Sequence, residues 1–170
     1  LGRGTNAATR LGPLINPAAV AKVEALVSQA LESGAALASG GKAPAGEGYF
    51  FEPTVLADVP ADAVILREEV FGPVAPVTVF ETEAEAVTIA NSTPFGLVGY
   101  VFTGDLNRSL RLAESLESGM LGINAGVVSN PAAPFGGVKQ SGLGREGGPE
   151  GIEEYLETRY VGIADPMRTA

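Results

Sequence analysis

The sequence of 170 residues predicts an α/β fold in which parallel strands are joined by crossover helices. Between residues 74 and 123, apolar runs typical of strands alternate with two segments of helical periodicity. At this spacing each helix can return the chain to the same end of a sheet. The chain has 45% hydrophobic residues, which is enough for a core in a domain of this length.

The first helix is predicted to begin at Asn16-Pro17, because asparagine caps free amides and proline suits the first helical position. Gly34 should end it. Gly40-Gly41 predicts a turn, and residues 44–48 have the composition of a loop. The apolar residues expected on one face of the helix are Val20, Val23, Val27, Ala30 and Leu31.

Residues 74–80 are the first strand candidate of the alternating region. Pro76 is expected near the start of that strand, because proline cannot donate to a central ladder. Residues 82–85 read Thr-Glu-Ala-Glu, a capping box that begins the next helix.

A second strand, predicted to be buried, covers the apolar run 97–102. Asp105 caps the following helix, Gly119 ends it, and residues 120–123 form the third strand. Active groups in parallel sheets gather at the carboxyl ends of the strands. We therefore expect binding or chemistry in residues 124–135.

The C-terminal region is predicted to contain a short helix over 149–156 and a half-buried strand over 158–163. A glycine-rich loop, residues 136–148, separates this strand from the sheet. The strand can therefore pair with something other than its own domain.

Charge and composition exclude several classes of function. The net charge of −9 repels nucleic acid and anionic membrane, so neither is an expected partner. No apolar run approaches the about 18 residues of a membrane span. The chain has no Cys and no His, so it cannot build a Cys-His or Ser-His-Asp centre or a thiolate metal site, and no metal is expected. Leu1, rather than Met, begins the chain, which suggests that residues precede it.

Two short motifs are interpreted as chance matches. Residues 142–147 fit the dinucleotide pattern G-x-G-x-x-G, but no strand is expected before them and no helix within them. Residues 39–42 match S-x-x-K between glycine-rich turns, without a partner motif.

Residues 124–146 hold the most informative pattern, Asn followed by Pro-Phe-Gly-Gly-x-Lys-x-Ser-Gly-x-Gly-Arg-Glu. The residues alone indicate an aromatic ring on a tight turn, which suits either a pocket wall or ordinary packing. The pattern closely resembles the aldehyde dehydrogenase superfamily. Further matches in the family's order are Gly-Pro-Leu-Ile at 12–15, Glu-Glu-Val-Phe-Gly-Pro at 68–73 and Phe-Gly-Leu at 95–97. The resemblance covers residues 10–164 and is strongest to the succinate-semialdehyde branch.

The resemblance implies roles for five residues. Glu69 matches a glutamate that hydrogen-bonds the ribose beside nicotinamide, the alternative being a solvated surface charge. Phe71 matches an aromatic packed near the nicotinamide, the alternative being a core residue. Phe135 matches a wall of the aldehyde tunnel, and Ser129 matches a serine that helps to hold the substrate carboxylate, the alternative being an ordinary loop hydroxyl. Asn124 matches an asparagine that supports the catalytic loop.

The resemblance also implies a Rossmann-like catalytic domain portion, residues 1–148, followed by a C-terminal helix and oligomerisation strand, residues 149–170. In the family, a thiolate attacks the aldehyde, a hydride passes to NAD or NADP, and activated water releases the acid. The nucleophilic cysteine and general-base glutamate lie before the matched region, so we expect this chain to be inactive alone. A cytoplasmic homo-oligomer, dimer or tetramer, acting on an aldehyde is expected.

Three classes of function remain open at this point. The chain is a fragment of a dehydrogenase, a non-catalytic binding or oligomerisation module made of this region, or a different small α/β enzyme. The absence of His and Cys weighs against the third class.

Overall fold

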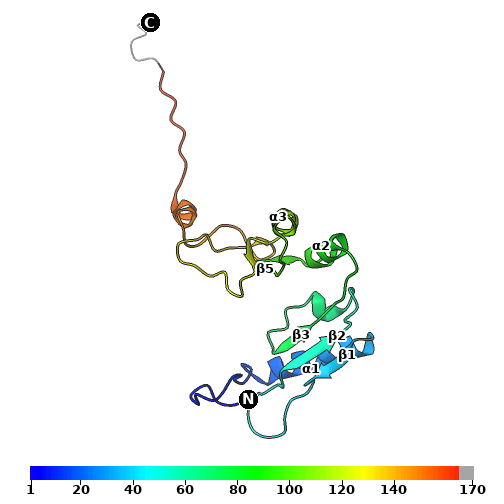
Figure 1. Cartoon of the computed structure of the whole chain (residues 1–170). Coiled ribbons are helices and arrows are strands. Elements are labelled where there is room, and N and C mark those ends of the chain that lie inside the picture. Colours follow the sequence, from blue (N-terminus) through cyan, green and yellow to red (C-terminus); the bar gives the residue numbers. More distant parts are fainter. Residues whose placement is uncertain (165–170) are drawn as a thin grey trace. The chain divides into compact units, whose positions relative to one another are not determined.

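The computed structural model describes residues 1–164 and divides the chain into two compact units (Figure 1). The first unit is Leu1–Thr93, and the second begins at Pro94. Over the described residues, no helix has the length and apolar character needed to cross a bilayer.

The first unit is a three-stranded sheet with a long helix packed against it. Strands β1 and β2 are antiparallel, β2 and β3 are parallel, and the order is β1-β2-β3. The elements are α1 (Pro17–Glu32), β1 (Ala36–Ser39), β2 (Thr54–Ala57), η1 (Val64–Leu66), β3 (Val74–Pro76) and α2 (Glu83–Asn91).

Helix α1 confirms the prediction for residues 16–34. The Asn16 side chain accepts a hydrogen bond from the Ala19 amide at 2.8 Å, and Gly34 lies just beyond the helix with φ of 108°. Val23, Val27 and Ala30 are buried as expected, and Leu26 joins them. The other residues of this core are Ala35, Phe51, Leu56, Val59, Ala63 and Ile65.

Strand β3 is shorter than the predicted strand over 74–80, and Pro76 lies at its end rather than near its start. β3 is an outer strand, and the Val77 amide donates to the Leu56 carbonyl of β2 at 2.8 Å. Because alternate residues face β2, the nitrogen of Pro76 points to the outer edge, where its missing N–H costs no bond to β2.

Helix α2 begins with the predicted capping box. The Thr82 hydroxyl accepts from the Glu85 amide at 3.2 Å, while the Glu85 carboxylate accepts from the Glu81 amide at 2.8 Å. In the standard capping box this second hydrogen bond comes from the amide of the N-cap residue, here Thr82, whereas in α2 it comes from the amide of the residue before it.

The second unit holds a strand–helix–strand motif and a small antiparallel pair. β5 and β6 are parallel, with α3 connecting them, and β4 pairs with β7. The elements are β4 (Phe95–Gly96), β5 (Val98–Val101), α3 (Leu106–Ser115), β6 (Met120–Ile123), β7 (Val138–Lys139) and η2 (Glu150–Tyr155).

The α/β class with parallel strands is confirmed, but the three predicted strands do not share one sheet. β3 pairs with β2, a strand that the sequence pattern did not mark, while β5 pairs with β6. Strand pairing depends on contacts between distant segments, so periodicity along the chain does not reveal it.

Strand β5 was expected to be buried, and this is wrong for most of its residues. Val101 is 9% exposed, but Tyr100 is 45% exposed and the neighbouring Phe102 is 70% exposed. The sheet of β5 and β6 has two strands, and the described residues leave much of its apolar surface uncovered.

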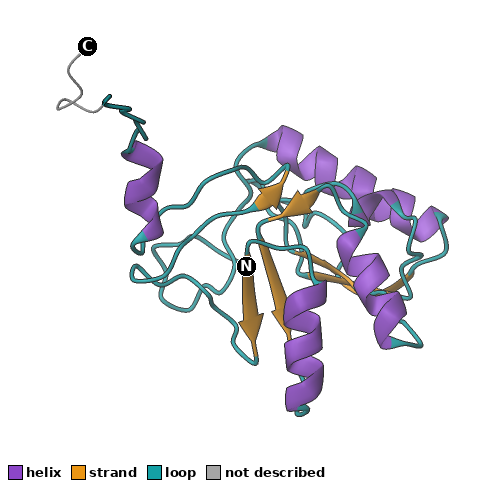
Figure 2. Ribbon diagram, turned by 90° about the horizontal axis from the view of Figure 1, so that it is seen from above, coloured by secondary structure: helices purple, strands orange, loops and turns teal. Residues whose placement is uncertain are grey.

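The C-terminal helix is a 3-10 helix, η2, and the residues after it are drawn as loop (Figure 2). Residues 158–163 form no strand, and Tyr160 is 91% exposed. The alternative to pairing between subunits is that this segment returns to the edge of its own sheet, and in the structure it does not. A strand needs a partner backbone, so pairing between subunits stays a prediction. Part of the predicted segment 149–170 lies outside the described residues.

Candidate functional site

The loop between η1 and β3 carries Glu69 and Phe71. The Glu69 side chain is exposed, and the Lys22 ammonium of α1 donates to the Glu69 backbone carbonyl. A Cβ added to Gly72 would approach Cγ2 of the fully buried Val23 to 2.5 Å. The loop is therefore held against α1 at two points, on either side of Phe71.

Phe71 has the left-handed φ of 46° and is 77% exposed. A bulky residue in this region carries backbone strain, and strain of this kind gathers at ligand-binding sites. The alternative that Phe71 is a core residue does not hold in this chain. The exposed ring has a flat apolar face suited to packing on a planar ligand.

In the second unit, Asn124 joins the carboxyl ends of β5 and β6. Its side-chain Oδ1 accepts from the Thr103 amide at 2.9 Å, and its Nδ2 donates to the Thr103 carbonyl at 2.8 Å. Its own amide donates to the Val101 carbonyl at 2.8 Å, and its φ is 52°. Asparagine tolerates this left-handed backbone better than most residues, which suits it to the sharp turn after β6.

The segment after Asn124 carries the two residues predicted for the substrate. Ser129 is exposed on a stretch without regular structure. Asn130 closes a turn there, since its side-chain oxygen accepts from the Ala132 amide at 3.0 Å. Phe135 is 39% exposed and exchanges two backbone hydrogen bonds with Glu146, each 2.7 Å long.

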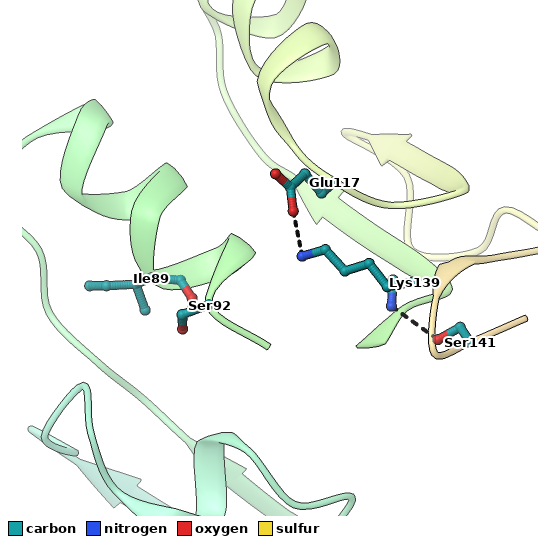
Figure 3. Close-up of polar contacts among 6 residues, drawn as sticks. Ile89, Ser92, Glu117, Lys139 and Ser141 are labelled. Carbon is teal, nitrogen blue, oxygen red and sulfur yellow. Dashed lines mark hydrogen bonds and ion pairs between the residues drawn. The ribbon is translucent and has the colours of Figure 1, made fainter. Parts of the chain in front are cut away.

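Close backbone contacts account for much of the glycine-rich pattern after Phe135. A Cβ added to Gly136 would lie 2.5 Å from the Gly144 carbonyl, and one on Gly119 would overlap the Gly136 carbonyl. Lys139, with φ of 54°, forms an ion pair with Glu117 (Figure 3). The pattern thus encodes a compact arrangement of loops.

Residues 142–147, which match the dinucleotide pattern by chance in our interpretation, also belong to this arrangement. Gly142, Gly144 and Gly147 all have positive φ. β7, only two residues long, precedes them, but no helix opens within them. The Arg145 guanidinium donates to the carbonyls of Gly137 and Gly144 at 2.8 and 2.7 Å.

Of the predicted site residues, Glu69 and Phe71 share one loop of the first unit, and Asn124, Ser129 and Phe135 share one segment of the second. Lys22 and Arg145 were not predicted to have roles, although Arg145 stands in the recognised pattern. The described residues contain no group of three or more acidic, His or Cys side chains that could hold a metal ion.

The start of α3 carries a carboxylate with a lowered pKa. The Asp105 carboxylate accepts from the Arg108 amide at 3.1 Å, and this bond holds the pKa of Asp105 below its usual value.

A family model described as the aldehyde dehydrogenase family matches residues 1–161. A succinate-semialdehyde dehydrogenase of Paenarthrobacter nicotinovorans is 59% identical over 97% of this chain and 37% of its own length. A glutarate-semialdehyde dehydrogenase of Pseudomonas aeruginosa strain PAO1 is 53% identical over 95% of the chain and 33% of its own length. An NADP(+) succinate-semialdehyde dehydrogenase of Escherichia coli K12 is 52% identical over 96% of the chain and 34% of its own length.

A crystal structure of succinate-semialdehyde dehydrogenase from Burkholderia pseudomallei has the same arrangement of elements. It superposes with a TM-score of 0.88 at 55% identity and covers 91% of this chain and 32% of its own. The chain thus spans about a third of the length of the relatives that it matches, between 33% and 37% for the curated proteins named above.

Proposed function

Because the chain belongs to the aldehyde dehydrogenase family, we propose that it forms the C-terminal part of an NAD- or NADP-dependent enzyme that oxidises an aldehyde to the carboxylic acid. The observation that carries this proposal is the exposed, strained Phe71 beside the exposed Glu69, on the loop where the family pattern requires cofactor contacts.

The chemistry of this loop fits a nicotinamide nucleotide. A carboxylate accepts hydrogen bonds from two neighbouring ribose hydroxyls, and Glu69 is exposed and able to do so. Phe71, a residue that is 77% exposed, offers an aromatic face to this ligand. When bound, the nicotinamide supplies the acceptor for the hydride that aldehyde oxidation releases. Glu69 and Phe71 bind and orient that group.

Ser129 and Phe135 form the substrate side of the proposal. Phe135 walls the aldehyde path and keeps water away from it, while the Ser129 hydroxyl donates to a carboxylate at the far end of the substrate. We favour succinate semialdehyde as the substrate, because its dehydrogenase is the relative with 59% identity. Asn124 keeps this segment at the carboxyl ends of β5 and β6 through its bonds to Thr103.

The nucleophilic thiolate of the reaction must come from residues outside this chain, and we assign the general-base glutamate to the same residues, as the family resemblance implies. The sequence has no Cys and no His, so it holds neither a thiolate nor an imidazole. The chain alone is therefore expected to oxidise no aldehyde. In the complete protein, residues 158–163 pair with a neighbouring subunit to give a dimer or tetramer, which we place in the cytoplasm.

A chimera tests this proposal. The chain replaces the matching C-terminal residues of the Paenarthrobacter nicotinovorans relative, and reduced cofactor is followed with succinate semialdehyde, glutarate semialdehyde and butanal. We expect turnover with the two carboxylated aldehydes to exceed turnover with butanal, and no turnover by the isolated chain.

A folded, oligomeric chimera without dehydrogenase activity would instead support the non-catalytic oligomerisation module. Turnover by the isolated chain above a blank without protein would refute the assignment of the nucleophile to residues outside it.

A further inference from the structure

The segment that carries Ser129 and Phe135 depends for its position on the glycine-rich loop that follows it. The Phe135 and Glu146 backbones exchange two hydrogen bonds of 2.7 Å, and the Gly148 amide donates to the Pro131 carbonyl at 3.3 Å. Residues 146–148 therefore form a platform under residues 131–135.

Arg145 fixes this platform to the turn that follows Phe135. Its Nη1 donates to the Gly137 carbonyl at 2.8 Å and to the Gly144 carbonyl at 2.7 Å, and both bonds are partly buried. Gly137 comes before β7, whereas Gly144, the residue next to Arg145, comes after it, so one guanidinium links the backbone on the two sides of this strand. Bonds from a charged donor at such distances are stronger than neutral ones.

The surrounding packing makes the position of Arg145 specific. A Cβ added to Gly136 would lie 2.8 Å from Arg145 Cδ, so the side chain runs directly over the backbone of the turn. From the other side, the Arg145 amide donates to Glu154 Oε1 of η2 at 3.3 Å. Arg145 is thus held between η2 and the turn after Phe135.

We propose that Arg145 is a positioning residue for the aldehyde site. Its bond to the Gly137 carbonyl and the backbone pair between Phe135 and Glu146 together fix the position of the Phe135 ring. Residues 131–135 carry this effect along the chain to Ser129. This inference rests on the proposed function, because it takes Ser129 and Phe135 as the residues that face the aldehyde. In this role Arg145 acts through the backbone that it holds, by way of the Gly137 and Gly144 carbonyls.

The first test measures amide hydrogen exchange in the 170-residue chain by NMR and does not depend on activity. Arg145→Ala should speed exchange at the Phe135 and Glu146 amides by about tenfold or more, because their mutual pair loses its support. The Asn124 amide, bonded to Val101, should be unchanged. Arg111→Ala, which removes an exposed arginine of the same unit, is the control. Unchanged exchange at Phe135 and Glu146 would overturn the proposal.

The second test uses the chimera. Arg145→Ala should lower kcat/KM for both succinate semialdehyde and butanal, by about tenfold or more, while the KM for cofactor stays the same. The loss should be the larger for succinate semialdehyde, because Ser129 is displaced together with Phe135. Millimolar guanidinium should restore part of the loss. If Arg145→Ala does not fold, Arg145→Lys, which can still reach one carbonyl, should show a smaller loss of the same kind.

A loss confined to succinate semialdehyde would show that the Phe135 side of the aldehyde site does not depend on Arg145 and would refute the positioning role as proposed. An unmodified chimera without activity would refute the proposed function, whereas the exchange measurement would still decide whether Arg145 supports Phe135.

Discussion

Replacing Glu69 with Gln tests the cofactor side of the site most directly. The substitution keeps the shape and one acceptor oxygen but removes the charge. The Glu69 carboxylate is exposed and forms no ion pair within the part of the chain that the structure describes, because Lys22 bonds to the backbone carbonyl instead. Its charge is therefore available to a ligand.

The magnitude follows from the bonds that the carboxylate would make. A hydrogen bond to a charged group contributes about 1.5–3 kcal/mol and a neutral one about 0.5–1.5 kcal/mol. Gln loses one acceptor oxygen and the charge assistance of the other, but solvent at this exposed position screens part of the effect. We expect a net loss of about 1.5–3 kcal/mol, or roughly ten- to hundredfold in affinity.

The assay compares the chimera with and without Glu69→Gln. Cofactor affinity is measured by titration and hydride transfer by single-turnover absorbance, with the aldehyde KM followed in parallel. Glu68→Gln is the matched control, because it removes a neighbouring exposed carboxylate. If both variants bind cofactor and transfer hydride like the parent, Glu69 is a surface charge and the cofactor assignment fails.

Three further outcomes are expected. Ser129→Ala in the chimera should lower kcat/KM for succinate semialdehyde by about ten- to hundredfold, through loss of a donor to a carboxylate, and leave butanal nearly unaffected; an equal loss for both would contradict the assignment. Deleting residues 157–170 from the chimera should reduce its light-scattering mass to that of a monomer without loss of secondary structure, and an unchanged mass would exclude the tail as the assembly element. The pKa of Asp105 is lowered by its bond to the Arg108 amide, so its contribution to stability is present above the unfolded pKa and is lost as pH falls through the folded one. Acid titration of thermal unfolding should therefore show a smaller stability loss in Asp105→Asn than in the parent, and identical profiles would refute this linkage.

Local features of the fold could be predicted from the sequence because they depend on neighbours along the chain. Asn16 and Thr82 cap their helices with amides three residues away, and Asp105 does the same. Such bonds are available as soon as the residue types stand at the right spacing. The starts of the three α-helices, the turn glycines and the strand over 120–123 therefore appear where the sequence indicates, whereas α3 ends at Ser115, before the predicted end at Gly119.

The candidate site was found by a different route. Glu69, Phe71, Ser129 and Phe135 stand out through a family pattern, since their residue types alone do not distinguish a binding group from a surface charge, a core ring or a loop hydroxyl. The structure excluded the core alternative for Phe71, a residue that is 77% exposed. No property of the sequence reports exposure at an isolated aromatic position.

The sequence by itself determined the α/β class, the starts of the three α-helices and the absence of a Cys or His for catalysis. Only the tertiary structure decided that β3 pairs with β2, that Asn124 holds Thr103, and that Arg145 joins the turn after Phe135 to the glycine-rich loop. The reason is physical. Caps and turns are made between residues a few positions apart, whereas strand pairing, burial and these carbonyl contacts arise when segments distant in sequence come together. Every backbone amide and carbonyl has the same donor and acceptor chemistry, so the sequence alone does not show which of them become partners.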